Sequence, residues 1–237
     1  LKPEEIDMDD GKAAEVLRVA SDKKRDQKII AAGFIPGWIG EGGLRPEPVH
    51  DFEPYSWSWD TGRALLEAAA TSIDPQVAER RNIRMANPAA EKRTSLNTIH
   101  CSYQMVAPGE FARAHRHTVN AGRFILESES AFTTLNGEKV LMEPNDVILT
   151  PNWLWHGLGN ESSEAAAFWV DFLDDPLVSA LKTIFFEVRD EKYKEMSINE
   201  DSPYHIKWRD VDLWLEEANH DPKGRHGRRI QLHTPSI

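Results

Sequence analysis

The middle of the chain carries short hydrophobic runs that alternate with turn residues. The runs span residues 103–106, 124–126, 131–135, 139–142, 147–150 and 165–170. Asn136-Gly137 separates two of them, and an Asn-Gly pair between strand-like runs is a strong signal for a tight β-hairpin. Short strands at regular spacing are typical of a barrel or a jelly roll. The pattern therefore predicts a mainly β fold with a jelly-roll barrel over residues 93–174.

The segments on either side of the barrel have a different texture. A helix over about residues 60–72 has an apolar stripe of Ala and Leu, and Asp60 or Thr61 can cap it. Residues 31–59 are rich in Gly, Pro and Trp, which favours an arm without regular structure. Further helices are predicted at about residues 12–21, 176–188 and 211–218, with a helical turn after Asp74-Pro75. The chain then divides into an N-terminal arm with helices (1–92), the barrel (93–174) and C-terminal helices with a tail (175–237).

The composition narrows the classes of partner. The 237 residues carry a formal net charge of -11 and no basic stripe of Lys and Arg, so neither nucleic acid nor an anionic membrane is an expected partner. The sequence has no run of about 18 apolar residues, the length that a transmembrane helix requires. Cys101 is the single cysteine. An internal disulfide is therefore impossible, and a cytoplasmic location is expected.

Three histidines in the barrel region carry the candidate chemistry. His115 and His117 are two residues apart, so their side chains point to the same face of a strand. A metal held by two imidazoles needs a third ligand from a neighbouring strand, and His156 is the natural candidate. Three neutral nitrogens on one side of a metal leave the opposite side open to substrate and oxygen, which suits an iron(II) oxygenase. Five other histidines lack such a partner and are expected to be exposed or structural: His50, His205, His220, His226 and His233.

Two spaced motifs surround these three histidines. They are Gly109-x5-His115-x-His117 and Pro151-x4-His156-x3-Asn160. Both resemble the motifs of the cupin superfamily, and this resemblance implies a cupin (jelly-roll) barrel with an N-terminal helical and extended arm and helices after the barrel.

The resemblance becomes narrower where the usual cupin Glu is absent. Cupins usually carry a Glu four or five residues after the second His, whereas Ala121 and Gly122 stand there. That absence is similar to the gentisate 1,2-dioxygenase group, which includes salicylate and 1-hydroxy-2-naphthoate dioxygenases and binds iron with three His. The likeness covers roughly residues 46–208. It implies an iron(II)-dependent dioxygenase that uses O2 to open the ring of a small hydroxylated aromatic acid, and we expect a homo-oligomer.

The resemblance also implies roles for residues around the metal. Ring cleavage in this group needs a substrate that chelates iron through a carboxylate and an ortho hydroxyl, and the rigid fork of an Arg suits the carboxylate. Arg123 lies six residues beyond His117 and is expected to share its face if the strand is unbroken. Gln104 matches a pocket Gln that bonds substrate or oxygen, and Asp171 matches an Asp that orients a ligand His or an Arg. Further substrate contacts are expected from His100 and from at least one of Arg80, Arg81 and Arg84.

Leu158 is the main departure from the group. The group usually has a His at this position, two residues after the ligand His, as a proposed acid/base, and Leu158 cannot move a proton. Turnover of gentisate is therefore expected to be slow unless His100 or a water molecule substitutes. An apolar Leu158 suits a ring that lacks the second hydroxyl.

Two other functions stay open from the sequence. A cupin lyase or isomerase would use the metal only as a Lewis acid, and a non-catalytic cupin would bind a small acid without turnover. Family members commonly carry two cupin domains, and this sequence has one. It is therefore either a one-cupin relative or a part of a longer chain that continues into a second cupin.

Overall fold

The computed structural model describes residues 23–38, 52–73, 81–90, 93–189, 196–218 and 228–232. The chain divides into two compact units, Leu1–His50 and Asp51–Ile237. In the first unit, helix α2 (Lys23–Ala31) is followed by a turn that carries Trp38. The indole Nε1 of Trp38 donates a hydrogen bond to Asp26 Oδ1 over 3.1 Å, and Arg25 lies over the indole ring. A carboxylate and a cation of the helix thus hold this tryptophan.

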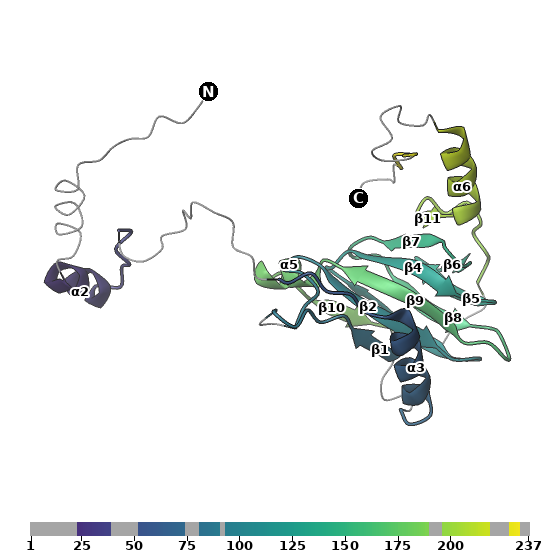
Figure 1. Ribbon diagram of the computed structural model, residues 1–237, viewed down its shortest axis with the longest axis horizontal. Coiled ribbons are helices and arrows are strands. Elements are labelled where there is room, and N and C mark those ends of the chain that lie inside the picture. Colours follow the sequence, from purple (N-terminus) through teal and green to yellow (C-terminus); the bar gives the residue numbers. More distant parts are fainter. Residues whose placement is uncertain are drawn as a thin grey trace. The chain divides into compact units, whose positions relative to one another are not determined.

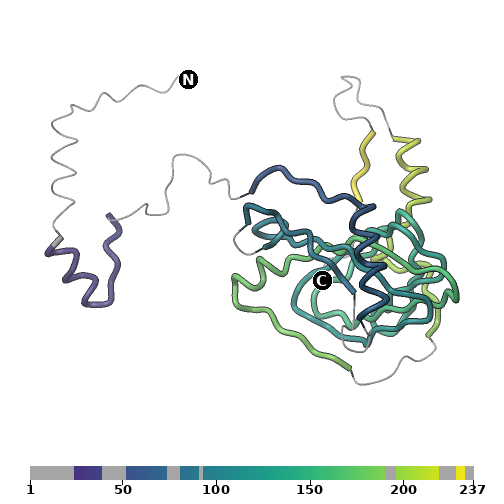
Figure 2. The backbone as a smooth tube through the Cα atoms, turned by 60° about the horizontal axis from the view of Figure 1, so that its bottom comes forward, coloured from purple at the N-terminus to yellow at the C-terminus, as the bar shows by residue number. Residues whose placement is uncertain are grey.

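The second unit is built on two antiparallel sheets (Figure 1). Figure 2 shows the course of its backbone from a second side. The six-stranded sheet has the order β1 (Arg81–Arg84), β2 (His100–Val106), β9 (Ala167–Leu173), β4 (Ala121–Glu127), β7 (Val147–Thr150) and β11 (His205–Ile206). The five-stranded sheet has the order β10 (Phe186–Val188), β3 (Phe111–His117), β8 (His156–Asn160), β5 (Ala131–Leu135) and β6 (Glu138–Leu141). The chain crosses repeatedly from one sheet to the other, as in a jelly roll.

One apolar cluster fills the space between the two sheets. Ile125 and Trp169 enter it from the six-stranded sheet, and Leu135 and Leu158 enter it from the five-stranded sheet. Because side chains alternate along a strand, the residues in between point outward. On the outer face of the six-stranded sheet they pack against helix α3 (Trp59–Ala70), which lies against β1 and β2 (Figure 1). Side chains on the inner faces of the two sheets therefore line the interior of the barrel, and a site inside the barrel is built from them.

The predicted mainly β jelly roll is confirmed, and one helix is wrong. Strands β5 and β7 have the predicted bounds, and helices α3 and α6 (Trp208–Glu217) lie close to theirs. A single helix is expected over residues 176–188. In the structure α5 covers only Asp175–Ala180, and residues 186–188 form strand β10. β10 pairs with the edge strand β3, with Phe186 opposite His117. The unpaired N–H and C=O groups at the edge of β3 form hydrogen bonds with residues 186–188, although the apolar spacing of this segment alone favours a helix.

Other predictions meet the structure only in part. The helix at 12–21 and the turn after Asp74-Pro75 lie outside the described residues. Strand β1 falls within the segment assigned to the N-terminal arm, yet it is an edge strand of the six-stranded sheet. No helix in the described ranges has the length and apolar character needed to cross a membrane.

Candidate metal centre

Three imidazoles converge at one end of the space between the sheets. His115 and His117 come from β3, and His156 of β8 is directly paired with His115. Their candidate ligand nitrogens all lie within 4.8 Å of one another. The ring centroid of His156 is 4.1 Å from that of His115 and 4.7 Å from that of His117. Three nitrogen donors at this separation fit a single transition-metal ion.

The backbone holds the second nitrogen of each ring. Nδ1 of His117 lies 2.8 Å from the Val119 carbonyl oxygen, and Nδ1 of His156 lies 2.8 Å from the Leu154 carbonyl oxygen. Nδ1 of His115 makes a longer contact, 3.5 Å, to a carbonyl two residues earlier. A carbonyl only accepts hydrogen bonds, so Nδ1 carries the proton and Nε2 carries the lone pair. Nε2 is therefore the atom that each ring offers to a metal.

Strand β10 covers one side of the three histidines. The ring centroid of Phe186 lies 5.1 Å from that of His115. On the outer side of the sheet, Arg116 of β3 forms an ion pair with Glu187 of β10. The ion pair joins β10 to the strand that carries two of the histidines. An aromatic ring thus shields the centre at the place where the sequence predicted a helix.

Arg123 is a fully buried cation between the sheets. Its side chain is 2% exposed, and Nη1 donates hydrogen bonds to Thr150 Oγ1 over 2.9 Å and to Thr133 Oγ1 over 3.4 Å. Nε lies 3.3 Å from Asp171 Oδ1. Burial lowers the pKa of the guanidinium, and the Asp171 carboxylate opposes that shift. Nη2 makes no hydrogen bond within the described part of the chain, so one arm of the fork is open to a carboxylate.

The expected unbroken strand from His117 to Arg123 is wrong, although both side chains belong to the interior. β3 ends at His117, and β4 begins at Ala121 in the other sheet. Arg123 therefore enters from the six-stranded sheet, on the wall opposite the histidines. Asp171, its neighbour across the strand pair, orients this arginine. The sequence left two partners open for Asp171, an Arg or a ligand His, and in the structure Asp171 contacts Arg123.

The inner face of the six-stranded sheet also presents buried nitrogens that have no hydrogen-bond partner among the described residues. Besides Arg123 Nε, which has only its ion-pair contact to Asp171, they are His100 Nε2, Gln104 Nε2 and Trp169 Nε1. Gln104 and Trp169 are directly paired in the sheet, and His100 lies on the same face of β2 as Gln104. A buried polar group left unpaired costs about 1–3 kcal/mol. This wall therefore suits a ligand with polar groups.

Sequence reasoning missed three residues of this wall. Trp169 follows from strand alternation two residues before Asp171, but its sequence context indicates only an apolar run. Asp175 Oδ1 accepts a hydrogen bond from Nδ1 of His100 over 2.7 Å, but its sequence context indicates only the start of a helix. Thr150 supports Arg123 from a strand whose end gave no signal of a polar role.

Two of the pre-barrel arginines lie on opposite faces of β1, and the third, Arg80, lies outside the described residues. Arg81 is opposite Met105 on the outer face and forms a two-armed ion pair with Glu110, at 2.5 and 2.8 Å. Burial raises the pKa of Glu110, but hydrogen bonds from Arg81 and a backbone amide outweigh it and hold the pKa below its ordinary value. Arg81 thus points away from the interior, and its expected substrate contact is corrected to a structural one.

Arg84 occupies a different position on the same strand. It is opposite Ser102, which is paired across the sheet with Asp171 on the inner face. Arg84 is exposed at the edge of the sheet. By register, Arg84 is the described pre-barrel arginine that shares the inner face.

Leu158 lies inside the barrel two residues beyond His156. It is 2% exposed, belongs to the central apolar cluster and is paired with Thr133 of β5. Its side chain therefore forms part of an apolar surface on the five-stranded sheet.

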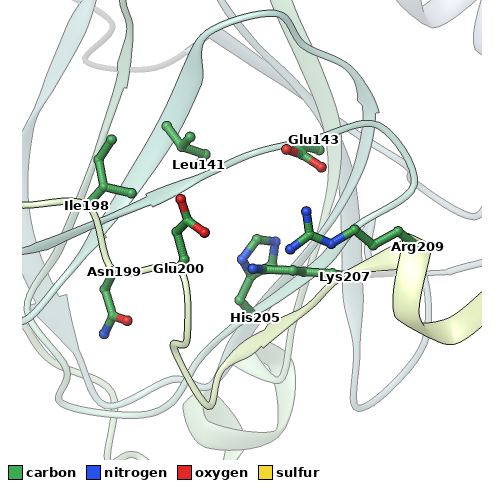
Figure 3. A pocket seen from close by; sticks show the side chains of 8 residues that line it. All are labelled: Leu141, Glu143, Ile198, Asn199, Glu200, His205, Lys207 and Arg209. Atoms are coloured by element: carbon green, nitrogen blue, oxygen red, sulfur yellow. The ribbon is translucent and has the colours of Figure 1, made fainter.

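A separate surface pocket lies beside β11 (Figure 3). Its lining residues are Leu141, Glu143, Ile198, Asn199, Glu200, His205, Lys207 and Arg209. His205 is bonded to Asp146 over 2.6 Å, and Asp146 also accepts a hydrogen bond from the Trp208 amide. None of the three clustered histidines lines this pocket. His205 therefore links β11 and α6 to the strand that follows Asp146.

Residues 102–173, which contain all three clustered histidines, match the family model of the cupin domain. This segment is a cupin domain. The chain is 40% identical over 149 residues to a gentisate 1,2-dioxygenase from Ralstonia sp, and the matched region covers 61% of this chain and 42% of the relative. It is 38% identical over 185 residues to a 5-aminosalicylate 1,2-dioxygenase from Comamonas sp, which covers 76% of this chain and 49% of the relative.

A solved structure adds to this likeness. The salicylate 1,2-dioxygenase from Pseudaminobacter salicylatoxidans superposes with a TM-score of 0.72 at 26% identity, over 83% of this chain and 63% of that one. The predicted resemblance to the gentisate and salicylate dioxygenase group is thereby confirmed. The chain spans about half the length of the curated relatives it matches.

Proposed function

We propose that this chain is an iron(II)-dependent dioxygenase that cleaves the ring of a hydroxylated aromatic carboxylic acid of the gentisate, salicylate or hydroxynaphthoate type. The observation that carries the proposal is the convergence of His115, His117 and His156, with no Asp or Glu in the described cluster. Three neutral ligands leave the charge of a divalent ion uncompensated. An anionic, chelating substrate is therefore favoured at the open face of the metal. The names of the relatives, which are gentisate and 5-aminosalicylate 1,2-dioxygenases, support this choice of substrate.

The side chains of the opposite wall have distinct tasks in this proposal. Arg123 binds the substrate carboxylate through its unused Nη2, and Asp171 positions the guanidinium. Gln104 donates from Nε2 to an oxygen of the substrate or to O2. Leu158 and the central apolar cluster exclude water from the ring. Bound iron(II) would supply the activation of O2 at the open face.

The assembly and location belong to the same proposal. Exposed apolar residues in the segment around β10, among them Phe185 and Phe186, support association into a homo-oligomer. The single cysteine supports a cytoplasmic protein, because an internal disulfide is impossible. The partners are then a small aromatic acid and O2.

Oxygen uptake tests the proposal directly. Metal-free protein is loaded with iron(II) without air and mixed with gentisate, salicylate, 5-aminosalicylate or 1-hydroxy-2-naphthoate. We expect iron-dependent consumption of O2 in equal amount to the acid, with loss of the aromatic absorption band. Zinc-loaded protein is the control. Metal-dependent turnover without O2 would instead support a lyase or isomerase, and binding without turnover would support a non-catalytic small-acid-binding cupin.

A further inference from the structure

His100 is a buried histidine on the wall opposite the three clustered histidines. It is the first residue of β2, and it pairs with Leu173 of β9, which in turn pairs with Ala121 at the start of β4. Its exposed fraction is 9%. Since side chains alternate along a strand, His100 faces the interior together with Gln104. The proposed function assigns no task to His100.

His100 lies at the same end of the barrel as the clustered histidines. Residues 118–120 join His117, at the end of β3, to Ala121, at the start of β4. Ala121 and His100 are both paired with Leu173 of β9, so they lie at the same level of the six-stranded sheet. The Asn120 amide donates to Asp174 Oδ1 over 2.8 Å, and the Asp174 amide donates to the Asn120 carbonyl over 3.3 Å. Asp174 directly precedes Asp175, the partner of His100. One mouth of the barrel therefore carries His117 on one sheet and His100 on the other.

The pairing with Asp175 fixes what His100 can do. Nδ1 of His100 lies 2.7 Å from Asp175 Oδ1, so Nδ1 donates to the carboxylate. Nε2 then carries the lone pair of the neutral ring, and it is buried with no hydrogen-bond partner in the described ranges. An imidazole oriented by a carboxylate, with its other nitrogen open to the site, is the arrangement of a general base.

The other polar groups that face this space from the same wall either only donate hydrogen bonds or are already ion-paired. The indole Nε1 of Trp169 and the amide Nε2 of Gln104 are donors only. Asp171 is engaged with the Arg123 guanidinium. On the opposite wall Leu158 is apolar. His156 Nε2, on the opposite wall, is reserved for the metal, so His100 Nε2 is the proton acceptor among the buried nitrogens of the six-stranded wall that lack a partner in the described ranges.

We propose that His100, positioned by Asp175, accepts the proton of a second ring hydroxyl that does not bind the metal. The inference rests on the proposed function, because it places an aromatic acid with its carboxylate and ortho hydroxyl at the metal. Such a ring turns its remaining substituents toward the six-stranded sheet. The preferred substrate class is then an aromatic acid with a hydroxyl on that remote side, such as gentisate. With Leu158 in place of the usual His, gentisate turnover is expected to be slow unless another group accepts the proton. The inference assigns that task to His100.

The step is a proton transfer between substrate and side chain. The O–H bond of the remote hydroxyl breaks, its electron pair stays on the oxygen, and a new N–H bond forms at His100 Nε2. The imidazolium that results lies against the Asp175 carboxylate, which balances its charge. The increased electron density of the phenolate favours attack on the ring by oxygen.

The test compares gentisate with salicylate, which lacks the remote hydroxyl. Steady-state kcat and KM are measured for iron-loaded wild type, His100→Gln, Asp175→Asn and His205→Gln. His100→Gln should lower kcat/KM for gentisate by roughly 10²-fold or more, the usual contribution of a positioned general base, and should change that for salicylate far less. Asp175→Asn should lower kcat for gentisate more than it raises KM.

His205→Gln is the matched control, because His205 is also a buried histidine bonded to a carboxylate. It lines the separate pocket of Figure 3, so its loss should leave the ratio of gentisate to salicylate unchanged. A parallel fall for both acids in His100→Gln, or no fall in either, would overturn the proposal.

A second measurement does not depend on turnover. The absorption spectrum of gentisate bound to zinc-loaded wild type should shift to longer wavelength than that of gentisate bound to zinc-loaded His100→Gln, because only the wild type forms the remote phenolate. Identical spectra would overturn the inference, as would failure of the zinc-loaded protein to bind gentisate. A shifted spectrum without oxygen uptake by the iron-loaded protein would support His100 as the acceptor while it refutes the dioxygenase.

Discussion

The two walls of the barrel interior differ in how their polar side chains are satisfied. On the five-stranded sheet, Nδ1 of each clustered histidine faces a carbonyl only two residues away in the sequence. On the six-stranded sheet, Arg123 depends on Thr150, 27 residues away, and His100 depends on Asp175, 75 residues away. Nitrogens on this second wall still lack partners in the described ranges. The backbone thus fixes the rings of the first wall and leaves Nε2 for a metal, whereas the second wall is held by distant side chains and leaves donors and one acceptor for a substrate.

This difference separates two requirements of the proposed chemistry. A metal site needs rings held in one orientation and one tautomer, and short-range backbone contacts supply both. A substrate site needs donors and acceptors that are desolvated but not yet engaged, which costs stability in the free protein. The following predictions change residues on one wall or behind it, and the measurements show whether metal binding, substrate turnover or stability responds.

The largest effect is expected from the five-stranded wall. His115→Ala or His156→Ala removes one of three ligands, so metal content after reconstitution should fall sharply and oxygen uptake should drop to background. Metal analysis checks the first result and an oxygen electrode the second. His205→Ala serves as control and should retain the metal. Full metal content in His156→Ala would contradict the assignment, whereas zinc in purified wild type would not, because such sites bind zinc more tightly than iron(II).

Arg123 on the six-stranded wall should give the next largest effect. Arg123→Lys keeps the charge but loses the fork, and the loss of a charged hydrogen bond of about 1.5–3 kcal/mol corresponds to roughly a 10- to 100-fold lower kcat/KM for the aromatic acid. Arg123→Ala should keep its metal, because backbone carbonyls orient the three histidine rings without any contact to Arg123. It leaves Asp171 buried without its cation, so the free energy of unfolding should fall by about 3–5 kcal/mol.

Arg84→Ala provides the comparison for both measurements. Arg84 is exposed at the sheet edge, so its loss should change the denaturation midpoint little. If Arg123→Ala turns over substrate as wild type does, the carboxylate binds elsewhere, and Arg84 is the first candidate by register.

The contrast between the walls also explains which parts of the site the sequence predicts. The clustered histidines are separated by spacings that a strand and its neighbour impose, so His115, His117 and His156 can be located from the motifs alone. The partners of the other wall meet only through the sheet register. Register is set by turns and packing over the whole barrel, and for this reason neither Asp175 nor Thr150 was found.

One error in the predicted fold and one question that the sequence left open have the same origin. The spacing of apolar residues at 176–188 fits a helix, but the free edge of β3 selects a strand for residues 186–188. Arg81 and Arg84 look alike in sequence, yet the pairing of β1 with β2 sends them to opposite faces of one strand. In each case a contact distant in sequence decided between local alternatives of similar strength.

Leu158→His tests whether the acid/base group can be moved from one wall to the other. Leu158 belongs to the central apolar cluster, so a buried imidazole there should lower the free energy of unfolding by about 1–3 kcal/mol. In the wild-type background, kcat/KM for gentisate should change little, because His100 already accepts the proton. In the His100→Gln background the same substitution should recover part of the lost activity. A large gain from Leu158→His alone would show that the six-stranded wall lacks a working base.

The smallest effect on the metal centre is expected from Glu110, which pairs with Arg81 on the outer face of the six-stranded sheet. The folded protein holds the pKa of Glu110 below its ordinary value of 4.5, so the ionised form stabilises the fold. That stabilisation is fully present above the unfolded pKa and is lost as pH falls through the folded pKa. Glu110→Gln should therefore be less stable than wild type at neutral pH, by about 1–3 kcal/mol, and the difference should shrink in acid. Urea denaturation at several pH values measures this difference in the free energy of unfolding.

Because Arg81 points away from the interior, the metal content of Glu110→Gln and its ratio of gentisate to salicylate turnover should stay as in wild type. A changed ratio would mean that Arg81 acts on the substrate wall after all.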